Sequence, residues 1–144
     1  MRFATFISAG LFLLSFVGNR ESFEPLFVGA DRCRLCHGSV YRAWKNSVHA
    51  GATDSILGKE HRQGCLECHA TGPNVLPGVQ CESCHGAGGN YWYPEVMMDP
   101  AKARGAGLVE PTESVCPSCH GSSLPDHSSQ FSMPGKADWL RAIH

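Results

Sequence analysis

The longest apolar run of the chain lies near its start. Residues 3–18 read FATFISAGLFLLSFVG, contain no charge and follow Met1-Arg2. A basic residue before such a run is typical of an export signal, and the run is short for a membrane-spanning helix, which needs about 20 residues. No clear small-residue cleavage site follows, so a retained anchor stays as the alternative. We therefore expect a signal peptide or anchor over residues 1–20 and one exported domain over residues 21–144.

Beyond this segment, apolar positions recur at helical spacing only in short stretches. Residues 39–49 and residues 136–144 show such spacing and predict two short helices. Asp99 followed by Pro100 predicts an N-cap and the first position of another helix, which should end at Gly105 or Gly107. Residues 112–116 should open a helix that runs into the last cysteine pair.

Glycine and proline separate these stretches. The segments 72–78, 86–90 and 121–130 are typical of loops. We therefore predict a mostly α fold with extensive loops and almost no sheet.

The composition indicates that the interior of this predicted fold is not filled by side chains alone. The chain has 16 glycines and nine prolines, and no long aliphatic run outside the N-terminal segment, so its side chains alone bury little core. The net charge of -1 gives no indication of nucleic-acid binding. Another component must fill the interior, and we expect the aromatic residues to pack on or near it: Phe27, Tyr41, Trp44, Tyr91, Trp92, Tyr93, Phe131 and Trp139.

All eight cysteines fall into four C-x-x-C pairs, and a histidine follows each pair directly. This motif attaches c-type haem: two thiols add to the vinyl groups on one porphyrin edge, and the histidine supplies an axial imidazole to the iron. The sequence therefore predicts four covalently bound haem c groups as the core. The motifs are Cys33-Arg-Leu-Cys36-His37, Cys65-Leu-Glu-Cys68-His69, Cys81-Glu-Ser-Cys84-His85 and Cys116-Pro-Ser-Cys119-His120, with His37, His69, His85 and His120 as proximal iron ligands.

Three other uses of paired cysteines compete with haem attachment. Disulfides are compatible with export, but they do not require a histidine after every pair. Thioredoxin-like redox chemistry needs a single pair in a βαβ context. The second and third pairs, separated by residues 69–80, have the spacing of a zinc ribbon and would be ambiguous if taken alone. Because these two motifs start only sixteen residues apart, we expect the second and third haems to be neighbours or nearly so.

Each haem iron has a second axial position, and the residues leave its ligands open. Four histidines lie outside the motifs, and Met97 and Met98 are alternative soft ligands. His49 is favoured because it lies on the predicted helix that follows the first motif. The other three are His61, His127 and His144.

The motifs and their flanks resemble the cytochrome c-554 family of small multihaem cytochromes. The resemblance covers roughly residues 29–144, and the third motif with its flanks is the most specific part. Around the first and second motifs, the matching positions are Cys33-x-x-Cys36-His37 with Tyr41-x-x-Trp44-Lys45-x-Ser47-x-His49-Ala50, and Cys65-Leu-x-Cys68-His69-x-Thr71-Gly72. Around the third motif they are Gly78-Val79-Gln80-Cys81-Glu82-Ser83-Cys84-His85-Gly86-x-Gly88. Around the fourth motif they are Val96-Met97-x-Asp99, Lys102-Ala103, Gly107-Leu108-Val109, Pro111-Thr112-Glu113 and Val115-Cys116-x-x-Cys119-His120.

The resemblance implies a helical fold packed around closely stacked haems that pass electrons singly. It implies that His49 is the distal ligand of the fourth-motif haem and that His144 is the distal ligand of the third. Met97 becomes the leading distal candidate for the first haem. The second-motif haem is implied to lack a sixth protein ligand, with His61 or His127 as the alternative that would close it.

We thus expect a periplasmic or extracellular electron-transfer protein rather than an enzyme, exchanging electrons with other cytochromes or an oxidoreductase. Membrane contact is expected only if the N-terminal segment is retained, and oligomers are possible. Two alternatives remain. One is a subunit of an extracellular cytochrome filament. The other is a small reductase of a nitrogen or sulfur oxide at an open haem, with His61, Arg62 or Glu67 as proton donors.

Overall fold

The computed structural model describes residues 26–58, 62–73 and 75–121. Within them, short helices alternate with loops, which confirms the prediction of a mostly α fold with almost no sheet. In chain order the elements are α1 (Ala30–Cys33), α2 (Gly38–Lys45), the 3-10 helix η1 (Asp54–Ile56), α3 (Arg62–His69), β1 (Ala70–Thr71), β2 (Leu76–Pro77), α4 (Cys81–His85), the 3-10 helix η2 (Gly88–Asn90), α5 (Pro94–Met97), α6 (Pro100–Gly105), the 3-10 helix η3 (Glu113–Val115) and α7 (Pro117–His120).

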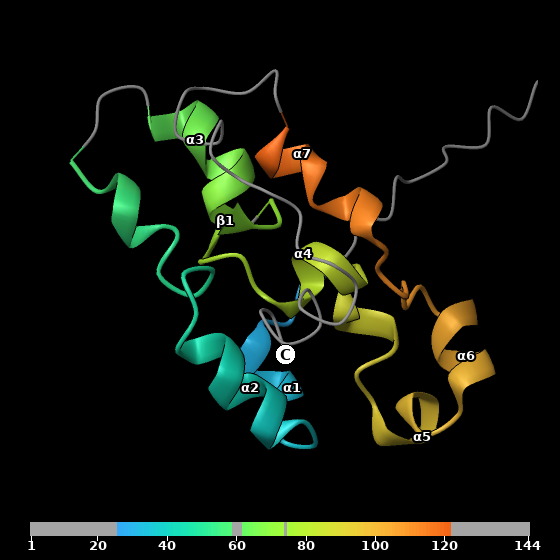
Figure 1. The fold of residues 1–144 in the computed structure, drawn as a ribbon. Coiled ribbons are helices and arrows are strands. Elements are labelled where there is room, and N and C mark those ends of the chain that lie inside the picture. Colours follow the sequence, from blue (N-terminus) through green and yellow to red (C-terminus); the bar gives the residue numbers. More distant parts are fainter. Residues whose placement is uncertain (1–25, 59–61, 74, 122–144) are drawn as a thin grey trace, which may run out of the picture.

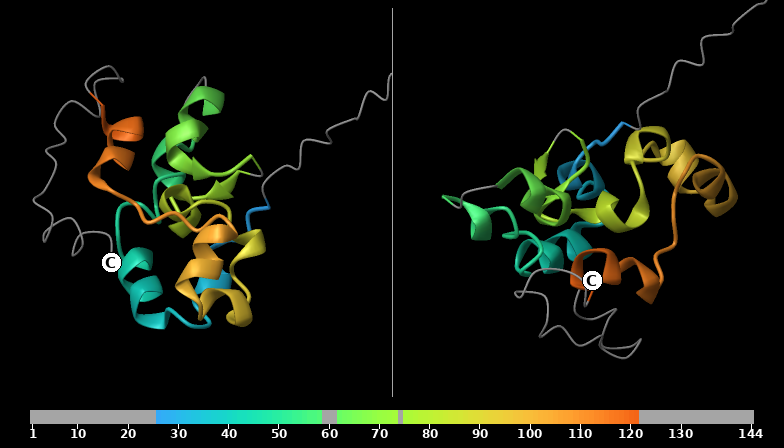
Figure 2. Two further views of the ribbon diagram at one scale, coloured as in Figure 1. Left: turned by 90° about the vertical axis from the view of Figure 1, so that its right-hand side faces the viewer. Right: turned by 90° about the horizontal axis from the view of Figure 1, so that it is seen from above.

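The helices surround α4, which lies near the middle of the molecule (Figures 1 and 2). Helices α3 and α7 lie together at one end, whereas α1, α2, α5 and α6 lie toward the other. Helix α1 packs against both α2 and α4, and α5 packs against α6. The segments that carry the first, second and fourth cysteine pairs therefore lie around α4, which carries the third pair.

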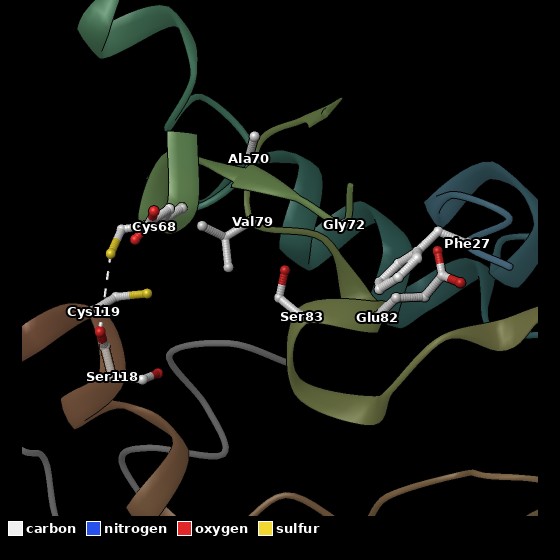
Figure 3. A pocket seen from close by; sticks show the side chains of 10 residues that line it. Phe27, Cys68, Ala70, Gly72, Val79, Glu82, Ser83, Ser118 and Cys119 are labelled. Atoms are coloured by element: carbon white, nitrogen blue, oxygen red, sulfur yellow. Dashed lines mark hydrogen bonds between the residues drawn. The ribbon is translucent and has the colours of Figure 1, made fainter. Parts of the chain in front are cut away.

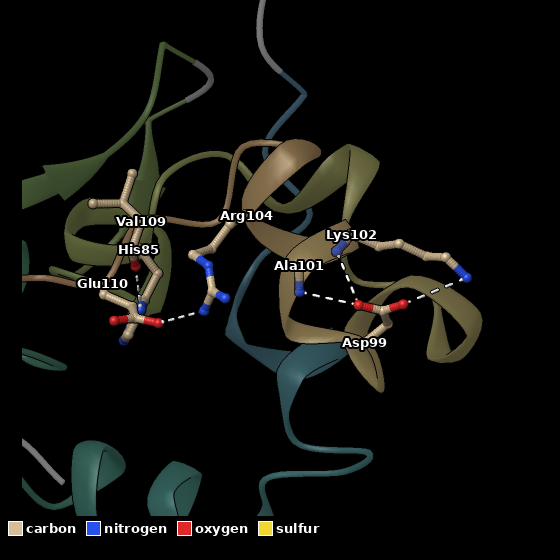
Figure 4. Close-up of polar contacts among 7 residues, drawn as sticks. All are labelled: His85, Asp99, Ala101, Lys102, Arg104, Val109 and Glu110. Atoms are coloured by element: carbon tan, nitrogen blue, oxygen red, sulfur yellow. Dashed lines mark hydrogen bonds and ion pairs between the residues drawn. The ribbon is translucent and has the colours of Figure 1, made fainter.

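Helix α6 matches its prediction closely. Pro100 is its first residue and Gly105 its last, and the side chain of Asp99 accepts hydrogen bonds from the backbone N–H groups of Ala101 and Lys102 at 3.0 and 3.1 Å (Figure 4). An aspartate N-cap satisfies N–H groups that have no partner within the first turn of a helix. These signals are local, which explains why the sequence predicts this helix well.

Helix α2 is shorter than the predicted stretch of residues 39–49, because it ends at Lys45. Ser47 turns back on the helix end: its backbone N–H donates to the carbonyl of Trp44 at 2.9 Å, and its hydroxyl donates to the same carbonyl at 2.7 Å. A serine that bonds backbone groups locally competes with helix continuation. His49 therefore lies in the turn after the helix, not on the helix as expected.

Two predicted loops contain short regular structure. Leu76–Pro77 pairs antiparallel with Ala70–Thr71 inside the region read as a loop over 72–78, and Gly88–Asn90 forms η2 inside the region 86–90. Within residues 112–116, Glu113–Val115 forms η3, which leads into α7, much as expected. The predicted helix over 136–144 and nearly all of the loop over 121–130 lie outside the described residues.

Few apolar side chains are buried. Among the described residues the buried hydrophobic ones are Ala30, Ile56, Ala70, Tyr91 and Ala103. Three of these five are alanines, so the side chains supply little apolar volume, in agreement with the expectation from composition.

Tyr91 is the largest residue of this small core. Its hydroxyl donates to the carbonyl oxygen of Gly86 at 2.6 Å and lies 3.1 Å from that of His85. Burial raises the pKa of Tyr91, so the phenol remains a donor at neutral pH. Of the other aromatic residues expected near a prosthetic group, Phe27, Tyr41, Trp44 and Trp92 are half-buried and Tyr93 is exposed, whereas Phe131 and Trp139 lie outside the described residues.

None of the helices in the part of the chain that the structure describes has the length and apolar character needed to span a membrane.

Candidate functional site

Each of the four C-x-x-C-H motifs lies in or against a helical turn. The first joins the end of α1 to the start of α2, the second ends α3, the third is α4 itself and the fourth spans the start and end of α7. In the first and fourth motifs the histidine N–H donates to the carbonyl of the first cysteine, from His37 to Cys33 and from His120 to Cys116, both at 2.9 Å. Positions i, i+3 and i+4 share one side of a helical turn. The backbone thus brings both sulfurs and the imidazole of a motif to one side.

The structure describes all eight cysteines, and none of them is in a disulfide. A zinc ribbon would need the sulfurs of Cys65, Cys68, Cys81 and Cys84 to converge on one point. Among the described residues no group of three or more histidine, cysteine, aspartate or glutamate side chains is arranged to hold a metal ion.

Two of the motif histidines are oriented through their Nδ1 atoms. His69 Nδ1 lies 2.8 Å from the carbonyl oxygen of Ala52, and His85 Nδ1 lies 3.0 Å from that of Val109 (Figure 4). A carbonyl oxygen only accepts, so Nδ1 carries the proton and Nε2 is left with the lone pair. This second bond is the one that orients histidines which ligate metals, and it suits both residues to a proximal role.

Sulfurs of different motifs meet in pairs. A hydrogen bond between Cys33 and Cys81 raises the pKa of Cys33 and lowers that of Cys81 to about 7. Burial and then a hydrogen bond with Cys119 raise the pKa of Cys68 to about 11. The Cys68 thiol also lies 3.9 Å from the carbonyl oxygen of Ser118. The first motif thus touches the third, and the second touches the fourth.

The third motif also adjoins the fourth. Burial and then the charge of Cys116 raise the pKa of Cys84. The four motifs are thus linked in the order first, third, fourth and second, by thiol hydrogen bonds at the two outer steps and by electrostatics alone at the middle step.

A cavity of about 240 Å³ opens between α3, α4 and α7. Figure 3 shows Cys68 and Cys119 at one end of it and Phe27 at the other. Cys68 and Ser83, from the second and third motifs, line the same space. The lining residues are Phe27, Glu67, Cys68, Ala70, Gly72, Val79, Glu82, Ser83, Ser118 and Cys119.

Of the distal candidates, the structure brings His49 to another motif. The ring centroids of His49 and His120 are 6.2 Å apart, with the ring planes inclined by 54°. Burial and then the charge of His120 lower the pKa of His49, so its imidazole is neutral at pH 7. Met97 is half-buried at the end of α5. His61, His127 and His144 lie outside the described residues.

One residue that the sequence reasoning missed organises the centre of the site. Glu82, only 3% exposed, lies between the cysteines of the third motif. Its carboxylate accepts hydrogen bonds from the backbone N–H groups of Val28, Gly29 and Gly88 at 2.6 to 3.2 Å. The only sequence signal was a charged residue beside glycine-rich segments, which does not by itself indicate burial.

A second polar network holds the same helix. The Thr71 hydroxyl, 1% exposed, lies 2.7 Å from the hydroxyl of Ser83, donates to the carbonyl of Gly78 at 2.8 Å and accepts from the N–H of Gln80 at 2.8 Å. The Gln80 side chain in turn accepts from the N–H of Ala30 at 2.6 Å. These contacts tie α4 to β1 and to the start of α1.

Comparison with known proteins gives two related matches. Residues 32–86, which contain the first three motifs, match the family described as cytochrome c554 and c-prime. The chain is also similar to cytochrome c-554 of Nitrosomonas europaea, with 30% identity over an alignment of 114 residues that covers 59% of this chain and 48% of the relative. It therefore spans about half the length of that curated relative.

No solved structure matches the chain significantly. The family model and the curated relative nevertheless agree with each other and with the motifs quoted from the sequence. The segment that carries the first three haem-attachment motifs is therefore similar to the cytochrome c-554 family.

Proposed function

We propose that this protein is an exported tetrahaem c-type cytochrome that passes single electrons between redox partner proteins. Similarity to a c-type cytochrome family supports covalently bound haem c, whose iron supplies one-electron redox chemistry when bound. The eight motif cysteines would hold four such groups, and His37, His69, His85 and His120 would be the proximal ligands. The protein would act as an electron carrier rather than as an enzyme.

The contacts between sulfurs of different motifs carry this proposal. The thiol of Cys33 forms a hydrogen bond with that of Cys81, and the thiol of Cys68 forms one with that of Cys119. Each of these sulfurs would join the edge of its own haem, so the fold brings attachment edges of different haems together. A protein built in this way suits transfer of electrons from one group to the next along the series of motifs.

The orientation of the proximal histidines supports the same conclusion. Nδ1 of His69 and of His85 donates to a backbone carbonyl, which leaves Nε2 to ligate iron and makes it a better donor. Ser55 adds a hydroxyl at 3.1 Å from Nδ1 of His69. These partners come from distant segments, so the fold rather than the motif alone orients the two rings.

His49 is proposed as the distal ligand of the fourth-motif haem. Imidazoles bind metal ions at about 2 Å, so two that bind opposite sides of one ion have ring centroids about 6 Å apart. The separation of 6.2 Å between His49 and His120 agrees with that value. His144 is proposed for the third haem by resemblance alone.

Met97 is proposed for the first haem. Arg32, beside the first motif, lies over the ring of Trp92 at 4.8 Å, so the segment that precedes α5 runs past α1. A methionine ligand would raise the reduction potential of this haem relative to one with two histidines.

The second-motif haem is proposed to keep an open distal position. Reduced five-coordinate haem binds carbon monoxide, so titration of the fully reduced protein should shift the Soret band of one haem in four. No shift would mean that all four irons are six-coordinate, and it would also remove the basis for a reductase function.

The haem count tests the proposal as a whole. The intact mass of the denatured protein should exceed the mature polypeptide by four haems, and its N-terminus should show whether residues 1–20 have been removed. A reversible redox titration should then involve all four groups. Fewer haems, or bound zinc, would contradict the proposal. A filament in size-exclusion chromatography or electron microscopy would favour the structural alternative.

A further inference from the structure

The charges of the described residues are unevenly distributed. Residues 26–58 carry four lysines or arginines and two aspartates, whereas residues 62–73 and 75–121 carry three lysines or arginines and six carboxylates. The chain as a whole has a net charge of -1. The part of the molecule that contains the first motif is therefore positive, and the part that contains the other three is negative.

The positive charges form one surface with two aromatic rings. The guanidinium of Arg34 lies 5.7 Å from the centroid of the Tyr41 ring, which is 5.4 Å from the Trp44 ring, and the ammonium of Lys45 lies 5.8 Å from Trp44. Arg42, next to Tyr41, shares a side of α2 with Lys45 at spacing i, i+3. We call this surface the cationic face: Arg34, Tyr41, Arg42, Trp44 and Lys45.

The rings of this surface are held in place by hydrogen bonds. The Trp44 Nε1–H donates to the carbonyl oxygen of Val79 at 2.7 Å, and the Tyr41 hydroxyl donates to Asp31 at 2.8 Å. Both rings are half-buried, whereas the three cations are exposed. The three cations thus lie beside two rings that hydrogen bonds hold in place, which limits the entropy lost when a partner binds.

Most of this positive charge has no acidic partner within the part of the chain that the structure describes. Asp31 is the one carboxylate described beside the cationic face, and it lies 4.0 Å from Arg34. Arg42 and Lys45 form no ion pair with a described residue. On α6, by contrast, Lys102 pairs with Asp99 at 3.6 Å and Arg104 pairs with Glu110 at 2.9 Å (Figure 4). Arg42 and Lys45 therefore leave positive charge available to an outside molecule.

This surface borders the first haem-attachment motif. Arg34 stands between Cys33 and Cys36, and α2 starts directly after His37. Cys36 and His37 are exposed. The intervening residues of the other three motifs include no cation: they are Leu66-Glu67, Glu82-Ser83 and Pro117-Ser118.

We propose that the cationic face is the docking surface for a redox partner protein with an acidic face, which exchanges electrons through the first-motif haem. This inference rests on the proposed function, since it assumes that a haem is attached to Cys33 and Cys36. Complementary charges steer two proteins together, and they mainly raise the association rate. A protein partner is favoured over an anionic membrane because hydrogen bonds fix Tyr41 and Trp44, which prevents the rings from inserting into lipid.

The test measures reduction of the oxidised holoprotein by a reduced acidic flavodoxin in a stopped-flow instrument, at salt concentrations between about 10 mM and about 0.5 M. The variant Arg42→Gln/Lys45→Gln removes two positive charges from the cationic face. The matched control Lys102→Gln/Arg104→Gln removes two from α6. All four substitutions avoid the motifs, and haem content is checked by mass first.

For the wild type we expect the rate constant to fall as salt rises, although both proteins are negative overall. At low salt the Arg42→Gln/Lys45→Gln variant should react at least about threefold more slowly, and the difference should vanish at high salt. The dissociation constant for oxidised flavodoxin, measured by biolayer interferometry, should rise by a similar factor. The control variant should match the wild type in both measurements.

Three results would overturn the docking surface. The first is a wild-type rate constant that rises with salt, and the second is an equal effect of the two variants on that rate constant. The third is that the Arg42→Gln/Lys45→Gln variant loses binding to anionic phosphatidylglycerol vesicles but keeps the wild-type rate constant and dissociation constant for flavodoxin. This third result would assign the surface to a membrane. Reduced methyl viologen, a small cationic reductant of low potential that needs no docking surface, separates this failure from that of the proposed function. If it fails to reduce the haems, the proposed function fails as well.

Discussion

The first and third motifs have the same five-residue pattern, yet the protein holds them in different surroundings. In the third motif, Glu82 is buried and accepts backbone hydrogen bonds from two other segments. In the first motif, Arg34 and Leu35 are exposed, as are Cys36 and His37. The attachment chemistry fixes only the cysteines and the histidine. The two residues between the cysteines are free to serve the fold in one case and the surface in the other.

This difference separates two tasks within one small domain. Helix α4 is tied to the start of α1, to β1 and to η2, so the third motif acts as the centre around which the other segments are arranged. The first motif lies at the edge of the molecule, where a partner can reach it. Four experiments, ordered from the largest expected effect to the smallest, test how far this contrast holds.

The largest effect should come from removing haem attachment everywhere. Changing all eight cysteines to serine should abolish cooperative folding, because the five buried apolar residues of the described part cannot offset the conformational entropy of the chain. Circular dichroism should show little helix in this variant. A cooperative unfolding transition would mean that the polar network around α4 is sufficient to hold the fold without haem.

The next effect should be confined to one haem in four. His49→Ala removes the imidazole that lies 6.2 Å from His120, so one haem should change from low spin to high spin. Electron paramagnetic resonance of the oxidised protein would count the two kinds of haem. His127→Ala serves as a control that should leave the count unchanged, and an unchanged count in His49→Ala would show that His49 is not a ligand.

A smaller effect should follow from changing the anchor of the third motif. Glu82→Gln replaces a carboxylate that accepts three backbone N–H groups with an amide whose NH₂ must face some of them. We expect the free energy of unfolding of the holoprotein to fall by about 2 kcal/mol, measured by guanidinium titration. The control Glu67→Gln changes an exposed glutamate that also stands between two motif cysteines, and it should cost less than about 0.5 kcal/mol.

The contrast between the two motifs also shows which features the sequence could reveal. The cap of α6 at Asp99 and the scarcity of sheet in the described part of the chain depend on neighbouring residues, and the structure agrees with both predictions. The role of Glu82 depends on Val28 and Gly29, more than 50 positions away. No local pattern reports such a contact.

The same reasoning explains the errors over α2 and residues 72–78. Apolar spacing continued to Val48, but the hydrogen bonds of Ser47 to Trp44 end the helix at Lys45. The pairing of β1 with β2 involves only two residues on each strand and includes Pro77, which is too short a stretch to produce an alternating pattern. The meeting of His49 with His120 requires the whole chain path between them.

The smallest effect should come from the Arg104–Glu110 contact on α6, whose distance of 2.9 Å falls within the range of the bonds made by Glu82. Distance alone would give the two contacts similar importance. The side chains of Arg104 and Glu110 are 53% and 74% exposed, however, so water and salt screen their attraction and compete for both partners. Arg104→Gln should therefore lower the free energy of unfolding by less than about 0.5 kcal/mol, and raising the salt should reduce even that difference. The same guanidinium titration measures it beside Glu82→Gln. A loss in Arg104→Gln as large as that in Glu82→Gln would mean that burial does not distinguish the two contacts, and the contrast between an anchored centre and an open edge would lose its physical basis.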